Sequence, residues 1–176
     1  MLAVAGESVS VIKRAAPEQA LKLKRQDEWS IYLEFLRVMF NLTDRVSALN
    51  IPLKEQPQFM DELTDTVIDQ LKKALEPAFG VGSDQTEIVL TIGTAVAESR
   101  QTYERYRFLV TEDSPAKNDL YRDFSDRIAS AVGAPKNPGV SAAATLCVSA
   151  VIPALIGIFE GQTLSLIHIS EPTRPY

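Results

Sequence analysis

Hydrophobic residues recur every three to four positions along most of the chain, which is the spacing of one face of an α-helix. Helix start and stop signals divide this pattern into segments. These segments run over residues 17–49, 57–80, 84–106, 114–133 and 137–159. No run of alternating polar and apolar residues has comparable strength, and the connections are short. The sequence therefore predicts an all-α fold, a single bundle of about five helices.

The segment before the first predicted helix has no clear periodicity. Val9, Val11 and Ile12 could form a short strand or fold against the body of the domain. We therefore assign no structure to residues 1–16 and place the helical bundle domain in residues 17–163.

The middle three helices each carry one hydrophobic stripe, which we expect to face inward. The residues of these stripes are Met60, Leu63, Val67, Leu71 and Leu75; Ile88, Ile92, Val96, Tyr103 and Tyr106; and Leu120, Phe124, Ile128 and Val132. Two helices open with a capping residue followed by a first-turn proline, Ser114-Pro115 and Asn137-Pro138. Asp84 and Glu87 predict a capping box at the start of the third helix.

The helix over residues 17–49 is apolar on most sides and has a single narrow polar stripe. This stripe holds Ser30 and the candidate site residues Glu34, Arg37, Asn41 and Asp44, spaced by three or four. We favour the interpretation that the stripe is the one solvent-facing edge of a central helix. If it instead faces other helices, Glu34 and Arg37 become the best site candidates, because buried charges need partners.

The helix over residues 137–159 contains no charged residue from Val140 to Phe159, a length sufficient to cross a bilayer. Small residues such as those at 142–144 permit tight packing in a soluble protein or in a membrane. Pro153 predicts a kink, which both settings tolerate. We favour a core helix, because the amphipathic helices before it need a common partner. The sequence thus predicts that the first and last helices are innermost.

The last residues of the chain resemble a translated transposase adapter used in sequencing libraries. The codons of that adapter give Leu-Ser-Leu-Ile-His-Ile-Ser-Glu-Pro-Thr-Arg, which is identical to residues 164–174. We therefore expect residues 164–176 to be foreign to the natural protein, whose own sequence is interrupted near Thr163. His168, the one histidine of the chain, then belongs to the adapter.

Without a natural histidine, several chemistries are excluded: Ser-His-Asp and Cys-His nucleophiles, and the Glu-x-x-His sites of di-metal bundles. Cys147 is the only cysteine, so no internal disulfide forms. The formal net charge of -5 gives no general attraction for nucleic acid. The segment 103–108 mixes aromatic and basic residues, but Tyr103 and Tyr106 fall on a core stripe. The Gly80-Val-Gly-Ser-Asp turn lacks the full pattern of a phosphate-binding loop.

These features favour a non-catalytic, cytoplasmic helical domain that acts through protein contacts or self-association. We expect no cofactor, no metal and no nucleic-acid partner. An alternative is a protein attached to the inner membrane by the helix over residues 140–159. A third interpretation is a small-molecule-binding bundle or enzyme that uses the polar stripe of the first helix.

Overall fold

The computed structural model describes residues 1–80 and 85–169, without the side chains of residues 78, 79 and 162–169. Helices are the only regular secondary structure within these residues, which confirms the predicted all-α class. They are α1 (Leu2–Ala15), α2 (Pro17–Ala20), α3 (Arg25–Asn50), α4 (Gln56–Phe79), α5 (Thr86–Tyr103), α6 (Pro115–Ala131), α7 (Pro138–Ser149) and α8 (Val151–Ile169). The predicted cap Asp84 lies outside the described residues. Of the predicted adapter segment 164–176, only the backbone of residues 164–169 is described, as the end of α8.

The N-terminal part of the chain differs from the prediction in two respects. Residues 1–16, left without a structure, form α1, which buries Ala5, Ser8, Val9 and Ile12. The helix predicted over residues 17–49 is interrupted at residues 21–24, between α2 and α3. The break has a local cause, because the Asp27 carboxylate accepts a hydrogen bond of 2.8 Å from the backbone N–H of Lys24 and so caps a new helix.

The middle helices follow the predicted pattern closely. All fourteen residues of the three predicted inward stripes are buried or half-buried. α4 ends at Gly80, whose φ of 87° suits glycine. Ser114 accepts a hydrogen bond from the backbone N–H of Lys117 at 3.2 Å, and Asn137 accepts from that of Gly139 at 2.9 Å. Both predicted N-caps are confirmed.

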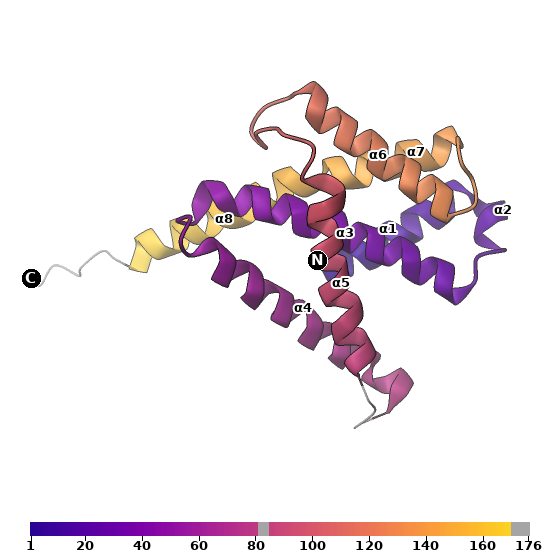
Figure 1. Ribbon diagram of the computed structural model, residues 1–176, viewed down its shortest axis with the longest axis horizontal. Coiled ribbons are helices and arrows are strands. Elements are labelled where there is room, and N and C mark those ends of the chain that lie inside the picture. Colours follow the sequence, from indigo (N-terminus) through magenta and orange to yellow (C-terminus); the bar gives the residue numbers. More distant parts are fainter. Residues whose placement is uncertain (81–84, 170–176) are drawn as a thin grey trace, which may run out of the picture.

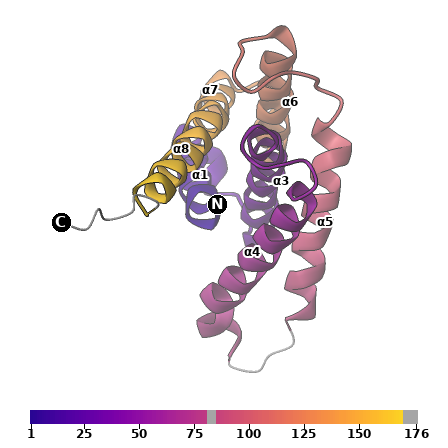
Figure 2. The same cartoon turned by 90° about the vertical axis from the view of Figure 1, so that its left-hand side faces the viewer.

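The helices cross one another rather than running parallel. Figure 1 and Figure 2 show α5 crossing α3 steeply, whereas α8 passes along the other side of α3. α1 packs on α3 and α7, and α6 packs along α7. The count of about five helices and the simple bundle are therefore not matched, because residues 1–16 add a helix and breaks near residues 21–24 and 150 divide the first and last predicted helices.

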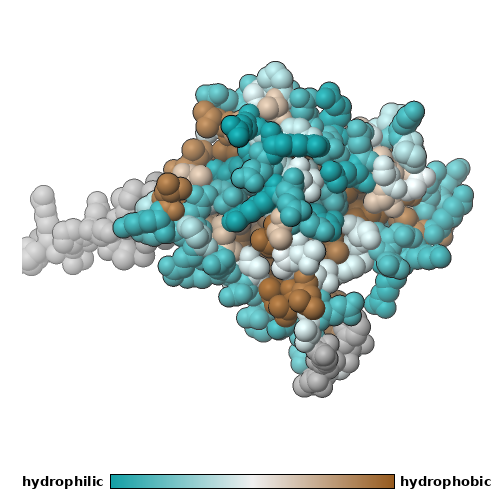
Figure 3. All heavy atoms as spheres, in the orientation of Figure 1, coloured by the Kyte–Doolittle hydropathy of each residue, from teal (hydrophilic) through white to brown (hydrophobic). Residues whose placement is uncertain are grey.

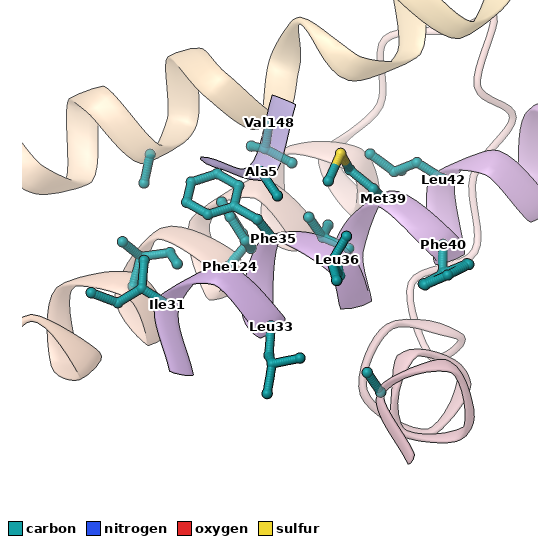
Figure 4. Packing of buried hydrophobic residues seen from close by; sticks show 14 of the residues in the cluster. Ala5, Ile31, Leu33, Phe35, Leu36, Met39, Phe40, Leu42, Phe124 and Val148 are labelled. Atoms are coloured by element: carbon teal, nitrogen blue, oxygen red, sulfur yellow. The ribbon is translucent and has the colours of Figure 1, made fainter. Parts of the chain in front are cut away.

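α3 lies at the centre of the fold, as predicted. Most residues between Ile31 and Ser47 are buried, on nearly every side of the helix. Figure 4 shows Phe35 against Phe124 of α6, with the ring centroids 5.0 Å apart in an edge-to-face arrangement. Ala5 of α1 and Val148 of α7 lie in the same cluster. Packing against several helices explains why even polar residues of α3, such as Glu34 and Asn41, are buried.

The last predicted helix is divided at Ala150 into α7 and α8. Pro153 has no N–H to donate to the carbonyl of Ser149, which accounts for the break and agrees with the predicted kink. One stripe of residues spaced by four lies in the core: Val140, Ala144, Val148 and Ile152. The expectation of an innermost helix is confirmed for this stripe only, because most other residues of α7 and α8 through Gly161 are exposed or half-buried.

Candidate functional site

The polar stripe predicted on the first helix lies mainly between α3 and α5. Glu34 is 8% exposed and Asn41 is 5% exposed. The favoured interpretation, a solvent-facing edge, is therefore wrong for these two residues. Of the stripe, only Ser30 is fully exposed, whereas Arg37 and Asp44 are half-buried. The side chains meet a second helix because α5 crosses α3 at this position (Figure 2).

Glu34 and Arg37 form the centre of a hydrogen-bonded network with α5. The Glu34 carboxylate accepts hydrogen bonds from the Tyr103 hydroxyl at 2.5 Å and from Nη1 of Arg37 at 2.9 Å. Arg37 also reaches Oε2 of Glu98, with Nε at 2.7 Å and Nη2 at 2.6 Å. The guanidinium thus lies between two carboxylates and compensates both of them.

Tyr103 is a neutral hydrogen-bond donor in this network. Burial, followed by the negative charge of Glu34 and the hydrogen bond to it, raises the pKa of Tyr103 far above its ordinary value of 10.0. The phenol therefore keeps its proton at any physiological pH. It cannot serve as a general base near neutrality, and its hydroxyl proton is already donated to Glu34.

Asn41 and Asp44 are held by other partners. The side-chain oxygen of Asn41 accepts a hydrogen bond of 2.8 Å from Nε of Arg45. Nη2 of the same arginine donates to the Tyr103 carbonyl at 2.9 Å. Asp44 accepts from the Gln56 amide at 3.0 Å, at the start of α4. Sequence reasoning missed Arg45 and Gln56 as members of the network. Arg45 follows Asn41 by four residues on the same helix, a spacing that could have indicated this contact. The contact of Gln56 with Asp44 depends on how α4 packs against α3.

The network connects α3 to α4 and α5 through side-chain hydrogen bonds, which indicates a structural role. Each of the four predicted site residues has a hydrogen-bond partner within the protein. Within the part of the chain that the structure describes, no three histidine, cysteine, aspartate or glutamate residues are grouped to hold a metal ion. The stripe accordingly offers little unsatisfied polar surface with which to bind a substrate.

A second candidate site is the exposed side of the last two helices. We define the outer face of α7–α8 as the residues that are exposed between 141 and 158: Ala142, Thr145, Leu146, Ala150, Pro153, Ala154, Gly157 and Ile158. Leu146 is 70% exposed and Ile158 is 57% exposed. Both lie in a segment that has no charged residue between 138 and 159. The most apolar 18-residue window of the helix over Pro138–Gly161 has a mean hydropathy of 2.2, and only 17% of that window is buried. It is thus long and apolar enough to cross a membrane.

The exposed hydrophobic residues continue beyond this helix. Phe159 of α8 contacts Phe59 of α4, with ring centroids 5.9 Å apart. Leu49 and Leu53, around the turn between α3 and α4, are 52% and 83% exposed. Figure 3 shows hydrophobic side chains gathered at the end of the molecule where the α3–α4 turn and α8 meet. An exposed apolar surface of this kind commonly marks an interaction site.

Comparison of the chain with protein-family models, curated proteins and solved structures finds no match.

Proposed function

We propose that this protein is a non-catalytic helical domain that self-associates through the outer face of α7–α8. The observation that carries the proposal is the exposure of a 24-residue helix without a charge before Glu160. Exposing that surface to water is unfavourable, and covering it with an apolar partner releases free energy in proportion to the area buried.

A helix that spans a bilayer alone is the less favourable use of this segment. Val140, Ala144 and Val148 are fully buried against the rest of the domain, and α7 packs along α6. Ser125 of α6 and Thr145 of α7 also share a hydrogen bond of 2.7 Å. Moving α7 into lipid would remove these contacts and open the core around Phe124 to water.

A second copy of the chain fits the outer face better than a membrane surface does. Helices that lie on membranes combine large apolar residues with a basic rim, and no lysine or arginine occurs between 138 and 161. The outer face instead carries small residues, including Ala150, Ala154 and Gly157, which allow another helix to approach closely. In a two-fold contact the same surface meets itself, and a surface without charge avoids placing like charges together.

The size of this contact sets the expected affinity. A helix of 24 residues is about 36 Å long and roughly 10 Å wide. Two such faces together cover about 700 Å², which is below the roughly 1,200 Å² at which stable interfaces begin. We therefore expect a weak dimer that forms at high micromolar concentration and dissociates on dilution.

We further infer that α1 to α8 act as one cooperative domain. The inner stripe of α7–α8, formed by Val140, Ala144, Val148 and Ile152, is fixed in its core. A cytoplasmic location accords with the half-buried, free thiol of Cys147, which needs no oxidising compartment.

Sedimentation equilibrium over a range of protein concentrations tests self-association. Leu146→Glu places a charge on the outer face, and Leu90→Glu makes the same change on α5, where the leucine is 65% exposed. We expect the wild type and Leu90→Glu to form dimers, and Leu146→Glu to remain monomeric and folded, with the melting temperature that the wild type has at concentrations where it is monomeric. A wild type that stays monomeric throughout, or dimers of Leu146→Glu as tight as those of the wild type, would overturn the proposal.

Flotation with vesicles of mixed neutral and anionic lipid separates the membrane alternative. Under the self-association proposal, the folded wild type stays in the protein fraction. If it floats with the vesicles and Leu146→Glu does not, the outer face binds lipid and the second-copy proposal is wrong.

A further inference from the structure

A pocket of about 630 Å³ lies apart from the α3–α5 network and from the outer face of α7–α8. It is enclosed by α1, the start of α3, the end of α4 and the start of α5. Of these four helices, α3 contacts α1 and α5, and α4 contacts α5 and α1. Its volume falls within the range of pockets that hold small molecules. None of the predicted site residues lines it, so it is separate from the α3–α5 network.

The apolar part of the pocket is formed by side chains from all four helices. These are Val9, Trp29, Tyr32, Leu75 and Ile88. The rings of Trp29 and Tyr32 stack on each other, with centroids 5.3 Å apart and planes 11° from parallel. Burial raises the pKa of Tyr32 to about 12, so this phenol is neutral at pH 7. The pocket therefore offers flat, uncharged aromatic surface against which a planar ring can stack.

The charged groups of the pocket balance one another. Lys13 of α1 and Glu28 of α3 form an ion pair at 2.6 Å. Arg25 and Glu87 contribute one further charge of each sign. A ligand with a net charge would enter a pocket whose own charges already sum to zero, and it would lose hydration without a net electrostatic gain. An uncharged ligand avoids this cost.

Neutral polar groups complete the lining. Ser10, Gln26, Gln85 and Thr91 carry hydroxyl and amide groups that can donate or accept hydrogen bonds. We propose that the pocket binds an uncharged, planar aromatic molecule, which stacks on the side chains of Trp29 and Tyr32 and forms hydrogen bonds through its edge. This inference is independent of self-association, because none of the residues 138–161 of α7 and α8 lines the pocket.

The chain provides its own reporter for this binding. Trp29 is the only tryptophan, so intrinsic tryptophan fluorescence comes from the pocket alone. We would titrate the full chain with N-phenyl-1-naphthylamine, an uncharged aromatic probe whose emission rises in apolar surroundings. The expected result is saturable quenching of Trp29 at one probe per chain, with energy transfer to the probe. The anionic probe anilinonaphthalene sulfonate should bind at least about tenfold more weakly.

Two glycines supply a matched pair of variants. Gly6 of α1 lines the pocket, and Gly93 of α5 does not. A Cβ atom added at either position meets no other atom within 4 Å, so both helices accept a side chain. Gly6→Phe should fill the pocket and weaken probe binding by about tenfold or more, whereas Gly93→Phe should bind the probe as the wild type does.

Each remaining outcome counts against the proposal. The absence of saturable quenching in the wild type, or unchanged binding by a folded Gly6→Phe, would show that the pocket does not take an aromatic ligand. Tighter binding of the anionic probe would overturn the uncharged ligand class. If Leu146→Glu abolishes the signal and Gly6→Phe does not, the probe binds the outer face of α7–α8 and the pocket assignment is wrong.

Discussion

α3 and the α7–α8 pair differ sharply in composition and in burial: α3 carries charged and polar residues along its length, whereas α7–α8 has none with a charge before Glu160. Between Ile31 and Ser47, α3 is covered on nearly all sides. Through Gly161, α7–α8 is covered along one stripe of residues spaced by four, and its other described residues are exposed or half-buried. Hydropathy therefore does not set how much of an element is buried, because burial depends on how many helices of the same chain pack around it.

The side chains of the two elements explain part of this difference. α3 contributes large residues such as Phe35 and Phe40, which fill space between several helices. The inner stripe of α7 contains small and medium residues such as Ala144 and Val148, which fit one shallow contact. The comparison leads to four expected results, in order of decreasing effect on stability.

Phe35→Ala should have the largest effect. The ring is 2% exposed and packs edge-to-face on Phe124, so its removal leaves a cavity at the centre of the domain. We expect a loss of about 3–5 kcal/mol in the free energy of unfolding. Urea denaturation followed by circular dichroism measures it. A loss below about 1 kcal/mol would show that α3 is not the central packing element.

Arg37→Ala tests whether the polar stripe is internal. The variant leaves Glu34, which is 8% exposed, without its cationic partner, and Glu98 also loses its ion pair. We expect a loss of about 2–3 kcal/mol. Arg122→Ala is the control, because Arg122 pairs with Asp119 one turn away on the surface of α6. That change should cost less than about 1 kcal/mol. Equal losses for both variants would place the stripe in solvent.

Alkaline pH should destabilise the protein through Tyr103. Its pKa is raised in the folded state, so the stabilising contribution is complete below the ordinary value of 10.0. Above that pH the unfolded chain releases the proton while the folded chain retains it, and stability falls by up to about 1.4 kcal/mol per pH unit for this group. Tyr103→Phe should therefore show a shallower decline between pH 10 and 11 in thermal unfolding. Parallel declines for the two proteins would indicate that the phenol is accessible to solvent.

Leu146→Ala should have the smallest effect on the folded monomer. The side chain is 70% exposed and lies on the outer face of α7–α8. Measured at a concentration where the protein is monomeric, the free energy of unfolding should change by less than about 0.5 kcal/mol. Val148→Ala, two residues away on the buried stripe, should cost clearly more. A larger loss for Leu146→Ala than for Val148→Ala would mean that α7 is rotated about its axis.

The local features of this fold were readable from the sequence, and the contacts between distant helices were not. The caps at Ser114 and Asn137 and the stripe through Leu120 and Phe124 depend on residues a few positions apart. The environment of Glu34 depends on Tyr103, which is too far away along the chain for a helical pattern to relate the two residues. The polar stripe of α3 was therefore correctly located, but the prediction that it faces solvent was wrong for Glu34.

Near the two ends of the chain, the sequence pattern also failed to predict helix boundaries and burial. α1 escaped prediction because its buried face includes the small residues Ala5 and Ser8, which give a weak periodic signal. The start of α3 was missed because the predicted helix already ran through residues 21–24. The Asp27 carboxylate, which caps the new helix at Lys24, was read as an ordinary helical residue. For α7–α8, the charge-free sequence was read correctly, but its exposure depends on how many helices the rest of the chain can place around it.

The central claim is that the outer face of α7–α8 meets a second copy while the inner stripe stays in the core. A nitroxide label on Ser149→Cys, in a Cys147→Ser background, tests it most directly. Residue 149 is at the middle of the helix over Pro138–Gly161, where two fully overlapping copies cross. Packed helices lie roughly 8–10 Å apart, so dipolar spectroscopy should give a distance between labels below about 25 Å. The absence of any such distance at concentrations well above the micromolar range would contradict the account.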